Sequence, residues 1–426
     1  MVKVPLQGKL LCLLIFFLVT FTMSESDQKA LEVIASSSQR FGLKLYKILR
    51  ENPGNVFFSP TSLEVVLALA HMGAKGKTAE EILAGLELPN DANLVKSGYN
   101  AIMKSLRSTG DMTLEIANKV YSEQTFSVEQ EFQLVAEKSF LAAAENVNFI
   151  GNPEGSRVVM NSWVEKQTHD KIKDLFGKGD ITPDTKMVLI NAVYFKGKWK
   201  HQFDPSKTSK EPFYITASQT KEVDMMHIKK KFGYLELEDL KAKLLVMPYI
   251  GDSMFMVILL PNEVDGLQEM EKKLHSINIA DLMKRADHVE VEVTLPRFKI
   301  ETTIDLVEPL QKLGVRSMFD PEFADFSGIS KEKGLYVSKV VQKAFIEVNE
   351  EGSEAAAATA QQIRFRRSAV WVEEFKVDRP FLIHLYSVSG VRIFYGSVKE
   401  VEAIQTKSNN TALNDISEPP DKHTEL

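Results

Sequence analysis

Residues 350–368 read Glu350-Glu-Gly-Ser-Glu-Ala-Ala-Ala-Ala-Thr-Ala-Gln-Gln-Ile-Arg-Phe-Arg-Arg-Ser368 and form the most unusual segment of the chain. Alanine, glutamate, glutamine and arginine all favour helix, and Gly352 could precede a surface helix. As a strand, the stretch would carry only small side chains on one face, at Ser353, Ala355, Ala357 and Thr359. Such a face could slide between two other strands without overpacking. Composition alone favours the helix, and both conformations are physically open.

The rest of the chain is predicted to form one large domain. Its 426 residues are 44% hydrophobic and 26% charged, the balance of a globular protein. Helical spacing and a capping box at Thr78 and Glu81 predict a helical N-terminal third, with helices over Ala30–Leu49 and Ser62–Met72 and a third that starts at Thr78. Strands are predicted over Met187–Phe195, Met254–Leu260, Val289–Leu295, Phe381–Tyr386 and Val391–Val398. Ser389 and Gly390 join the last two as a hairpin. Helices followed by strands indicate an α+β fold.

Four other segments, together with Glu350–Thr359, resemble signatures of the serpin family. They are Asn55-Val-Phe-Phe-Ser-Pro-Thr-Ser62, Asn191-Ala-Val-Tyr-Phe-Lys-Gly-Lys-Trp199, Arg379-Pro-Phe-Leu382 and Phe394-Tyr-Gly-Ser-Val398. They follow the order of the family over nearly the whole chain. The resemblance implies a serpin-like fold with three β-sheets, eight or nine helices and an exposed reactive loop over about residues 350–375, in a domain of residues 25–400.

The resemblance also implies an inhibitor of serine proteases rather than an enzyme. A target protease attacks the reactive loop and forms an acyl-enzyme. The cut loop then inserts as a strand into the largest sheet and distorts the protease before water can hydrolyse the ester. We therefore expect no catalytic residue, cofactor or metal. A non-inhibitory serpin that acts as a carrier or chaperone is the alternative, and the small, proline-free hinge argues against it.

Roles of single residues follow from the same resemblance. The loop hinge comprises Glu351, Gly352, Ser353, Glu354, Ala355, Ala356, Ala357, Ala358 and Thr359. Ser59, Ser62 and Asn191 are assigned to the region under the sheet that must part, and Trp199 to the point where the loop enters. Small hydrogen-bonding residues are equally expected of plain core structure there. Many relatives have histidine where this chain has Gln342, whose amide cannot titrate near neutral pH.

The bait in the loop is rich in arginine. Counting from Gly352, as in typical inhibitory relatives, puts the scissile bond between Arg366 and Arg367. The run that begins at Arg364 also resembles the Arg-x-Arg-Arg sites of furin-like proprotein convertases, which would cut between Arg367 and Ser368. We expect Arg-cleaving serine proteases as partners, with furin-like convertases favoured and trypsin-like enzymes next. A solvated basic run of no consequence is the other interpretation of these arginines.

Both termini carry features of the secretory pathway. Residues 1–24 contain two lysines, an apolar run and then small or polar residues, the order of a signal peptide, and the run is shorter than the ~20 residues of a spanning helix. Residues 401–426 are polar, predict a flexible tail, and end in His423-Thr-Glu-Leu426, which is similar to tetrapeptides bound by the endoplasmic-reticulum retrieval receptor. Asn409 begins a glycosylation sequon in this tail. We expect retention in the endoplasmic reticulum by retrieval, or secretion.

Charge, cysteine content and motifs exclude several other functions. The sole cysteine, Cys12, lies in the signal segment, so the mature chain is expected to contain neither a disulfide nor a thiol nucleophile. A net charge of −6 argues against nucleic acid or anionic membrane as the main partner. No Gly-x-Ser-x-Gly, phosphate-loop or His-Glu-x-x-His motif is present, and the eight histidines lack metal-ligand spacing. We expect a monomer without membrane insertion.

Overall fold

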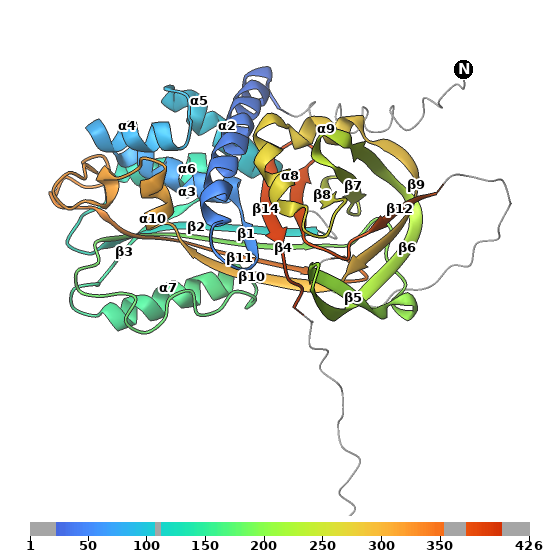
Figure 1. The fold of residues 1–426 in the computed structure, drawn as a ribbon. Coiled ribbons are helices and arrows are strands. Elements are labelled where there is room, and N and C mark those ends of the chain that lie inside the picture. Colours follow the sequence, from blue (N-terminus) through green and yellow to red (C-terminus); the bar gives the residue numbers. More distant parts are fainter. Residues whose placement is uncertain (1–22, 107–111, 353–371, 403–426) are drawn as a thin grey trace, which may run out of the picture.

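The computed structural model describes residues 23–106, 112–352 and 372–402, in which helices cover two hydrogen-bonded sheets (Figure 1). This part of the chain forms nine α-helices: α2 (Glu25–Leu49), α3 (Pro60–Gly73), α4 (Gly76–Gly85), α5 (Ala92–Ser105), α6 (Gln130–Phe140), α7 (Pro153–Gln167), α8 (Leu267–Lys273), α9 (Ile279–Arg285) and α10 (Val307–Lys312). Short 3₁₀ helices occupy Pro205–Lys207 (η1), Glu238–Leu240 (η2), Leu274–Ser276 (η3) and Ser317–Phe319 (η4). The predicted α+β class and helix number are confirmed.

A five-stranded sheet contains the longest uninterrupted pairing of the described residues, that of β2 with β4. Its order is β10 (Phe298–Asp305), β11 (Val337–Val348), β4 (Met187–Gly197), β2 (Met112–Glu123) and β3 (Ala143–Val147). β4 and β11 are parallel and hydrogen bond directly to each other, from Met187 opposite Val337 to Tyr194 opposite Phe345. β4 is buried on both faces, which accounts for its nearly continuous apolar sequence. A strand that inserted here would have to separate β4 from β11.

The second sheet has nine strands. Its order is β1 (Val56–Phe58), β14 (Arg392–Val398), β13 (Phe381–Ser387), β8 (Met254–Pro261), β7 (Ala242–Pro248), β6 (Gln219–Leu237), β9 (Asp287–Pro296) and β12 (Glu373–Lys376), with β5 (Ser209–Thr216) beside β6. β6 pairs with β9 through residues 225–234 and with β7 through residues 233–237. Two of the three expected sheets are therefore joined through β6.

Helices lie on both faces of the five-stranded sheet (Figure 1). α7 crosses one face, where Met160 and Val164 belong to the same buried cluster as Val188 and Ile190 of β4. α3 lies against the opposite face, in the main core, and α2, α5 and α6 lie beyond it. The β4–β11 interface is therefore covered on both sides by helices.

Most sequence-based boundaries are confirmed within a few residues, including the hairpin of β13 and β14 around Gly390, which has φ +81°. α2 begins at Glu25 rather than near Ala30, because the Ser24 hydroxyl caps it by accepting a hydrogen bond from Asp27 N at 3.1 Å. These additional residues extend the helix by more than one turn at its N-terminus.

The predicted capping box at Thr78 and Glu81 is wrong. α4 begins at Gly76, so Thr78 lies inside it. The Thr78 hydroxyl accepts a hydrogen bond from Asp325 N at 3.0 Å. The Glu81 carboxylate accepts from the backbone N–H groups of Arg316 and Ser317 at 2.8 and 2.6 Å. Both side chains fix a segment distant in the sequence instead of the end of their own helix.

Candidate functional site at the β4–β11 interface

Trp199 lies where the chain leaves β11. Its indole Nε1 donates to the Asn349 carbonyl at 3.0 Å, and its backbone N–H donates to the Glu351 carbonyl at 2.7 Å. The indole stacks on Tyr249 with ring centroids 4.4 Å apart, and only 1% of Trp199 is exposed. The first residues after β11 are therefore held against a rigid aromatic pair.

Gly352 closes this turn through its backbone conformation. Its φ is +139°, and an added Cβ would lie 2.1 Å from the Gly197 carbonyl oxygen and 2.7 Å from Lys198 Cα. The Asn349 N–H donates to the Gly352 carbonyl at 2.8 Å, and Asn349 Oδ1 accepts from the N–H groups of Glu351 and Gly352 at 3.2 Å. Only glycine fits this position without moving the backbone.

Glu350 ties the same turn to two other segments. Its carboxylate accepts a hydrogen bond from the Thr208 hydroxyl at 2.7 Å and lies 3.6 Å from a guanidinium nitrogen of Arg297. Its backbone carbonyl accepts from Phe203 N at 2.8 Å. The side chain is 10% exposed. Glu350 therefore links the end of β11 to the segment before β5 and to the connection between β9 and β10.

A row of three amide side chains crosses the middle of the five-stranded sheet. Asn191 of β4 lies opposite both Asn118 of β2 and Gln342 of β11. Asn191 Nδ2 donates to Asn118 Oδ1 at 2.6 Å, and Gln342 Nε2 donates to Asn191 Oδ1. All three are buried. The link between Gln342 and Asn191 spans the interface that an inserting strand would have to open.

Ser59 and Ser62 connect this row to the start of α3. The Gln342 amide forms two hydrogen bonds with the Ser59 backbone, accepting from its N–H at 2.8 Å and donating to its carbonyl at 2.9 Å. Asn191 Nδ2 donates to the Ser62 hydroxyl, and the Ser59 hydroxyl accepts from Ser62 N at 3.3 Å. One helix terminus thus binds both sides of the β4–β11 interface.

The structure brings Ser59, Ser62 and Asn191 together and places Trp199 at the end of β11 beside Gly352. It adds two groups that sequence reasoning missed, Asn118 in the amide row and the Glu350 contacts. Asn118 could have been noticed as an amide inside a strand pattern, but its partner depends on strand register. Other predicted features lie outside the described residues: residues 1–22 of the signal segment with Cys12, hinge residues Ser353–Thr359, the bait residues Arg364, Arg366, Arg367 and Ser368, and Asn409 with the C-terminal tetrapeptide.

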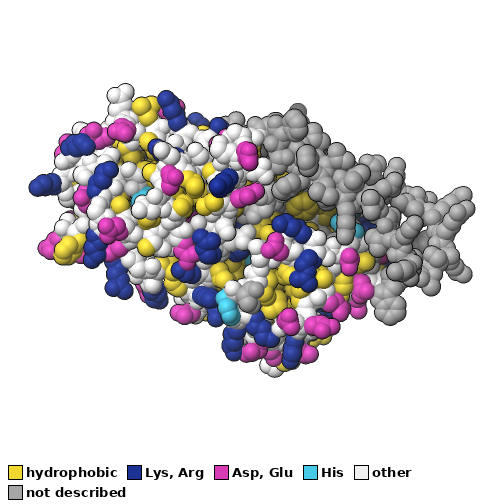
Figure 2. Space-filling model, turned by 90° about the horizontal axis from the view of Figure 1, so that it is seen from above, with side chains coloured by type: hydrophobic (Ala, Val, Ile, Leu, Met, Phe, Trp, Pro, Cys, Tyr) yellow, Lys and Arg dark blue, Asp and Glu magenta, His cyan; other side chains and the backbone are white. Residues whose placement is uncertain are grey.

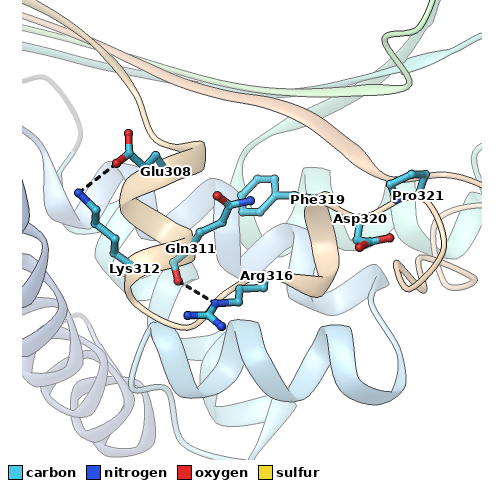
Figure 3. Close-up of a pocket in the computed structure, with 7 residues that line it drawn as sticks. All are labelled: Glu308, Gln311, Lys312, Arg316, Phe319, Asp320 and Pro321. Atoms are coloured by element: carbon cyan, nitrogen blue, oxygen red, sulfur yellow. Dashed lines mark hydrogen bonds and ion pairs between the residues drawn. The ribbon is translucent and has the colours of Figure 1, made fainter.

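One surface hollow lies apart from these residues. An open hollow of about 520 Å³ lies between α10 and η4 and is lined by Glu308, Gln311, Lys312, Arg316, Phe319, Asp320 and Pro321 (Figure 3). On the face shown in Figure 2, lysine and arginine side chains are interspersed with acidic ones. Within residues 23–106, 112–352 and 372–402 there is no group of three metal-ligating side chains, and no helix there is long and apolar enough to cross a membrane.

Comparison with known proteins places this geometry in one family. Residues 36–401 match the family model described as Serpin (serine protease inhibitor). Leukocyte elastase inhibitor from Homo sapiens is 38% identical over 376 residues, which cover 86% of this chain and 99% of that protein. The chain belongs to the serpin family.

Two solved structures extend the comparison. The crystal structure of Serpin48, a highly specific serpin of the insect Tenebrio molitor, is 36% identical with a TM-score of 0.78, covering 87% of this chain and 99% of that one. Human thyroxine-binding globulin, complexed with thyroxine, is 26% identical with a TM-score of 0.80, also covering 87% of this chain and 99% of that one. A protein named for binding a small molecule thus resembles this chain as closely in backbone as Serpin48 does.

Proposed function

We propose that this serpin inhibits serine proteases by trapping them as covalent acyl complexes. The observation that carries the proposal is the direct pairing of β4 with β11 beside a chain that leaves β11 in a tight turn at Gly352. If the cut loop turns back at Gly352, it runs antiparallel to both strands and can hydrogen bond to each. The small side chains of the hinge suit this path because they can enter between packed strands.

Opening the interface requires the hydrogen bond between Gln342 and Asn191 to break. Their remaining bonds to Ser59, Ser62 and Asn118 keep most of their polar atoms satisfied while the strands separate. Since an unpaired buried polar group costs about 1–3 kcal/mol, this arrangement lowers the barrier to opening. Inhibition is then a competition between insertion of the strand and hydrolysis of the acyl-enzyme.

The proposed targets are proteases that cleave after arginine, with furin-like convertases favoured and trypsin-like enzymes next. The support is Arg364-Phe365-Arg366-Arg367 inside the bait. The name of the human relative refers to an elastase, so overall similarity does not support this target. Cleavage between Arg367 and Ser368 is the convertase form of the proposal, and cleavage between Arg366 and Arg367 is the trypsin form.

We further propose that the protein acts inside the secretory pathway. The signal-like residues 1–24 and the terminal tetrapeptide His423–Leu426 support entry into the endoplasmic reticulum and retrieval to it by the retrieval receptor. Deleting His423–Leu426 should move the protein from early secretory compartments to the medium. Furin-like convertases also act in this pathway, which agrees with the proposed target.

A carrier function is the second candidate, because thyroxine-binding globulin has a closely similar backbone. The hinge of this chain favours inhibition, since Ser353–Ala358 contain only small residues and one glutamate and no proline. A carrier would be cut in its loop and would release the protease. Formation of a stable complex with a protease therefore separates the two functions.

The test is to incubate the mature protein with a furin-like and a trypsin-like protease and look for a complex that survives denaturing detergent. Ser353→Arg is the matched control, because it leaves the bait intact but forces an unpaired charge into the inserting strand. We expect complex with the wild type and turnover with the variant. Free turnover of both would contradict trapping.

Target specificity is tested in the same assay with Arg364→Ala. In the convertase form, Arg364 lies four residues before the cut and would form a charge-assisted pair worth roughly 1.5–3 kcal/mol, so its loss should slow convertase inhibition about ten- to a hundredfold. Trypsin-like inhibition should change little. A released fragment that starts at Arg367 in the convertase reaction, or equal losses with both enzymes, would contradict the convertase assignment.

A further inference from the structure

Glu64 is a buried acid that the proposed inhibition does not use. It lies on α3, is 0% exposed, and neither carboxylate oxygen has a hydrogen-bond partner among the described residues. Two other buried glutamates are bonded. Glu123 accepts from the N–H groups of Phe149 and Ile150 at 2.6 and 3.0 Å, and the Glu271 carboxylate binds the Tyr46 hydroxyl. Glu64 is therefore exceptional among the buried acids in the described core.

Charged groups face Glu64 from several neighbouring elements without pairing with it. Arg40 of α2 is near enough to lower the pKa of Glu64, but it pairs with Glu87, which follows α4, at 2.5 Å. Arg392 of β14 has the same effect on the pKa of Glu64, but its Nε donates to the Tyr386 hydroxyl at 2.9 Å. Both cations are thus already engaged with other groups.

Of the remaining polar neighbours, only the Ser38 hydroxyl favours the ionised carboxylate of Glu64, and that hydroxyl is already shared. The Ser38 hydroxyl of α2 shares a hydrogen bond with the Thr61 hydroxyl at 2.9 Å. The Tyr99 hydroxyl of α5 is buried without a partner among the described residues. Further along α3, His71 is half-buried, and desolvation lowers its pKa, so it adds no cation near neutral pH.

These surroundings favour the protonated acid. Burial raises the pKa of Glu64 well above its ordinary range, and the Ser38 hydroxyl and the two arginines oppose that shift only in part. A neutral carboxyl group can stay between α2 and α5, whereas an ionised one without a partner is strongly disfavoured in an apolar core.

We propose that Glu64 is a proton-controlled lock on α3. In its neutral form it lets α3 pack against α2, α5 and β14, and its ionisation loosens that packing. Because Ser59 caps α3 and Ser62 lies in its first turn, the loosening reaches the contacts that tie β4 to β11. The proposal does not rest on the proposed inhibition, and its test uses no protease.

The sign of the pH dependence follows from linkage. The folded pKa of Glu64 lies above that of an unfolded glutamate, which is about 4.3. The stability that Glu64 permits is therefore complete below about pH 4.3 and is lost as the pH rises through the folded pKa. The fully buried His384 acts with the opposite sign, because desolvation and the nearby Arg392 lower its pKa. A comparison of variants must cancel this second contribution.

The experiment measures the unfolding equilibrium constant of the full chain by denaturant titration from pH 5 to pH 8, for wild type and Glu64→Gln. The ratio of the wild-type to the variant constant cancels His384 and other groups. It should rise about tenfold per pH unit up to the folded pKa and then level off. Hydrogen exchange over residues 60–73 should follow the same pH dependence in the wild type only.

Two further variants keep the test decisive. Glu64→Met replaces Glu64→Gln if the amide is poorly tolerated, and it should give the same dependence. Glu271→Gln alters a buried glutamate that has hydrogen-bond partners. In this variant, hydrogen exchange over residues 60–73 should keep the pH dependence of the wild type. A ratio that stays constant from pH 5 to pH 8 with either Glu64 variant, or pH-independent exchange of α3 in the wild type, would overturn the proposal.

Discussion

The β4–β11 interface is closed in two different ways along its length. At the end of β11, closure depends on shape, because a glycine with φ +139° fits against the Gly197 carbonyl and an indole covers the turn. In the middle of the sheet, closure depends on hydrogen bonds, because Gln342 binds Asn191 and the Ser59 backbone. The steric fit at Gly352 tolerates no added atom, whereas the hydrogen bonds of Gln342 can break and form again.

We expect the greatest loss of stability at the end of β11, where steric fit closes the interface. Gly352→Ala would place a Cβ within 2.1 Å of a backbone oxygen at a backbone conformation that disfavours alanine. We expect it to lower the free energy of unfolding by roughly 3 kcal/mol. Denaturant titration measures this, with Gly177→Ala as control, because the nearest atom to its added Cβ is a side-chain oxygen 3.4 Å away. Equal effects of the two substitutions would show that the Gly352 turn is not tightly closed.

A smaller effect is expected in the amide row. Gln342→Ala removes both hydrogen bonds to the Ser59 backbone and the bond to Asn191, leaving buried donors and acceptors unpaired. We expect a loss of about 2 kcal/mol in the free energy of unfolding. Hydrogen exchange should rise along residues 187–194 and 337–345 more than near residue 352. Uniform exchange changes over both regions would remove the distinction between them.

Gln342→His places a titratable group in the middle of the β4–β11 interface. A neutral imidazole can accept or donate in the same place, but burial would lower its pKa below the unfolded value of about 6.5. Its contribution to stability would therefore be present above that value and lost as the pH falls through the folded pKa. The melting temperature of the variant relative to that of wild type should therefore fall between pH 7 and pH 5. A constant difference over this range would contradict the burial of position 342.

The smallest effect is expected for Glu350→Gln. The amide keeps an acceptor for the Thr208 hydroxyl and loses only the charge that faces Arg297 at 3.6 Å. We expect a loss of about 1 kcal/mol or less in the free energy of unfolding, partly reproduced in wild type by high salt. A loss as large as that of Gly352→Ala would mean that charge, rather than shape, closes the end of β11.

Sequence reasoning reached the α+β class, most strands and the placement of Ser59, Ser62 and Asn191 in one region, because periodicity and family motifs are local signals. It failed where the partner is distant in the chain. Thr78 and Glu81 have the spacing of a capping box, but they bind residues 316–325. Asn118 joins the amide row only through the register of β2 with β4, and Glu350 meets Thr208 and Arg297 only in the folded chain.

In the proposed inhibition, β4 and β11 must separate for a protease to be trapped, and a disulfide across their interface tests this requirement directly. Val193 and Ala344 lie opposite each other and are fully buried, and neighbouring strands are close enough for a disulfide. In a chain that carries Val193→Cys and Ala344→Cys, the reduced form should give a detergent-stable protease complex. The oxidised form should only be cut and should release active protease. Equal complex formation by both forms would contradict insertion between these strands.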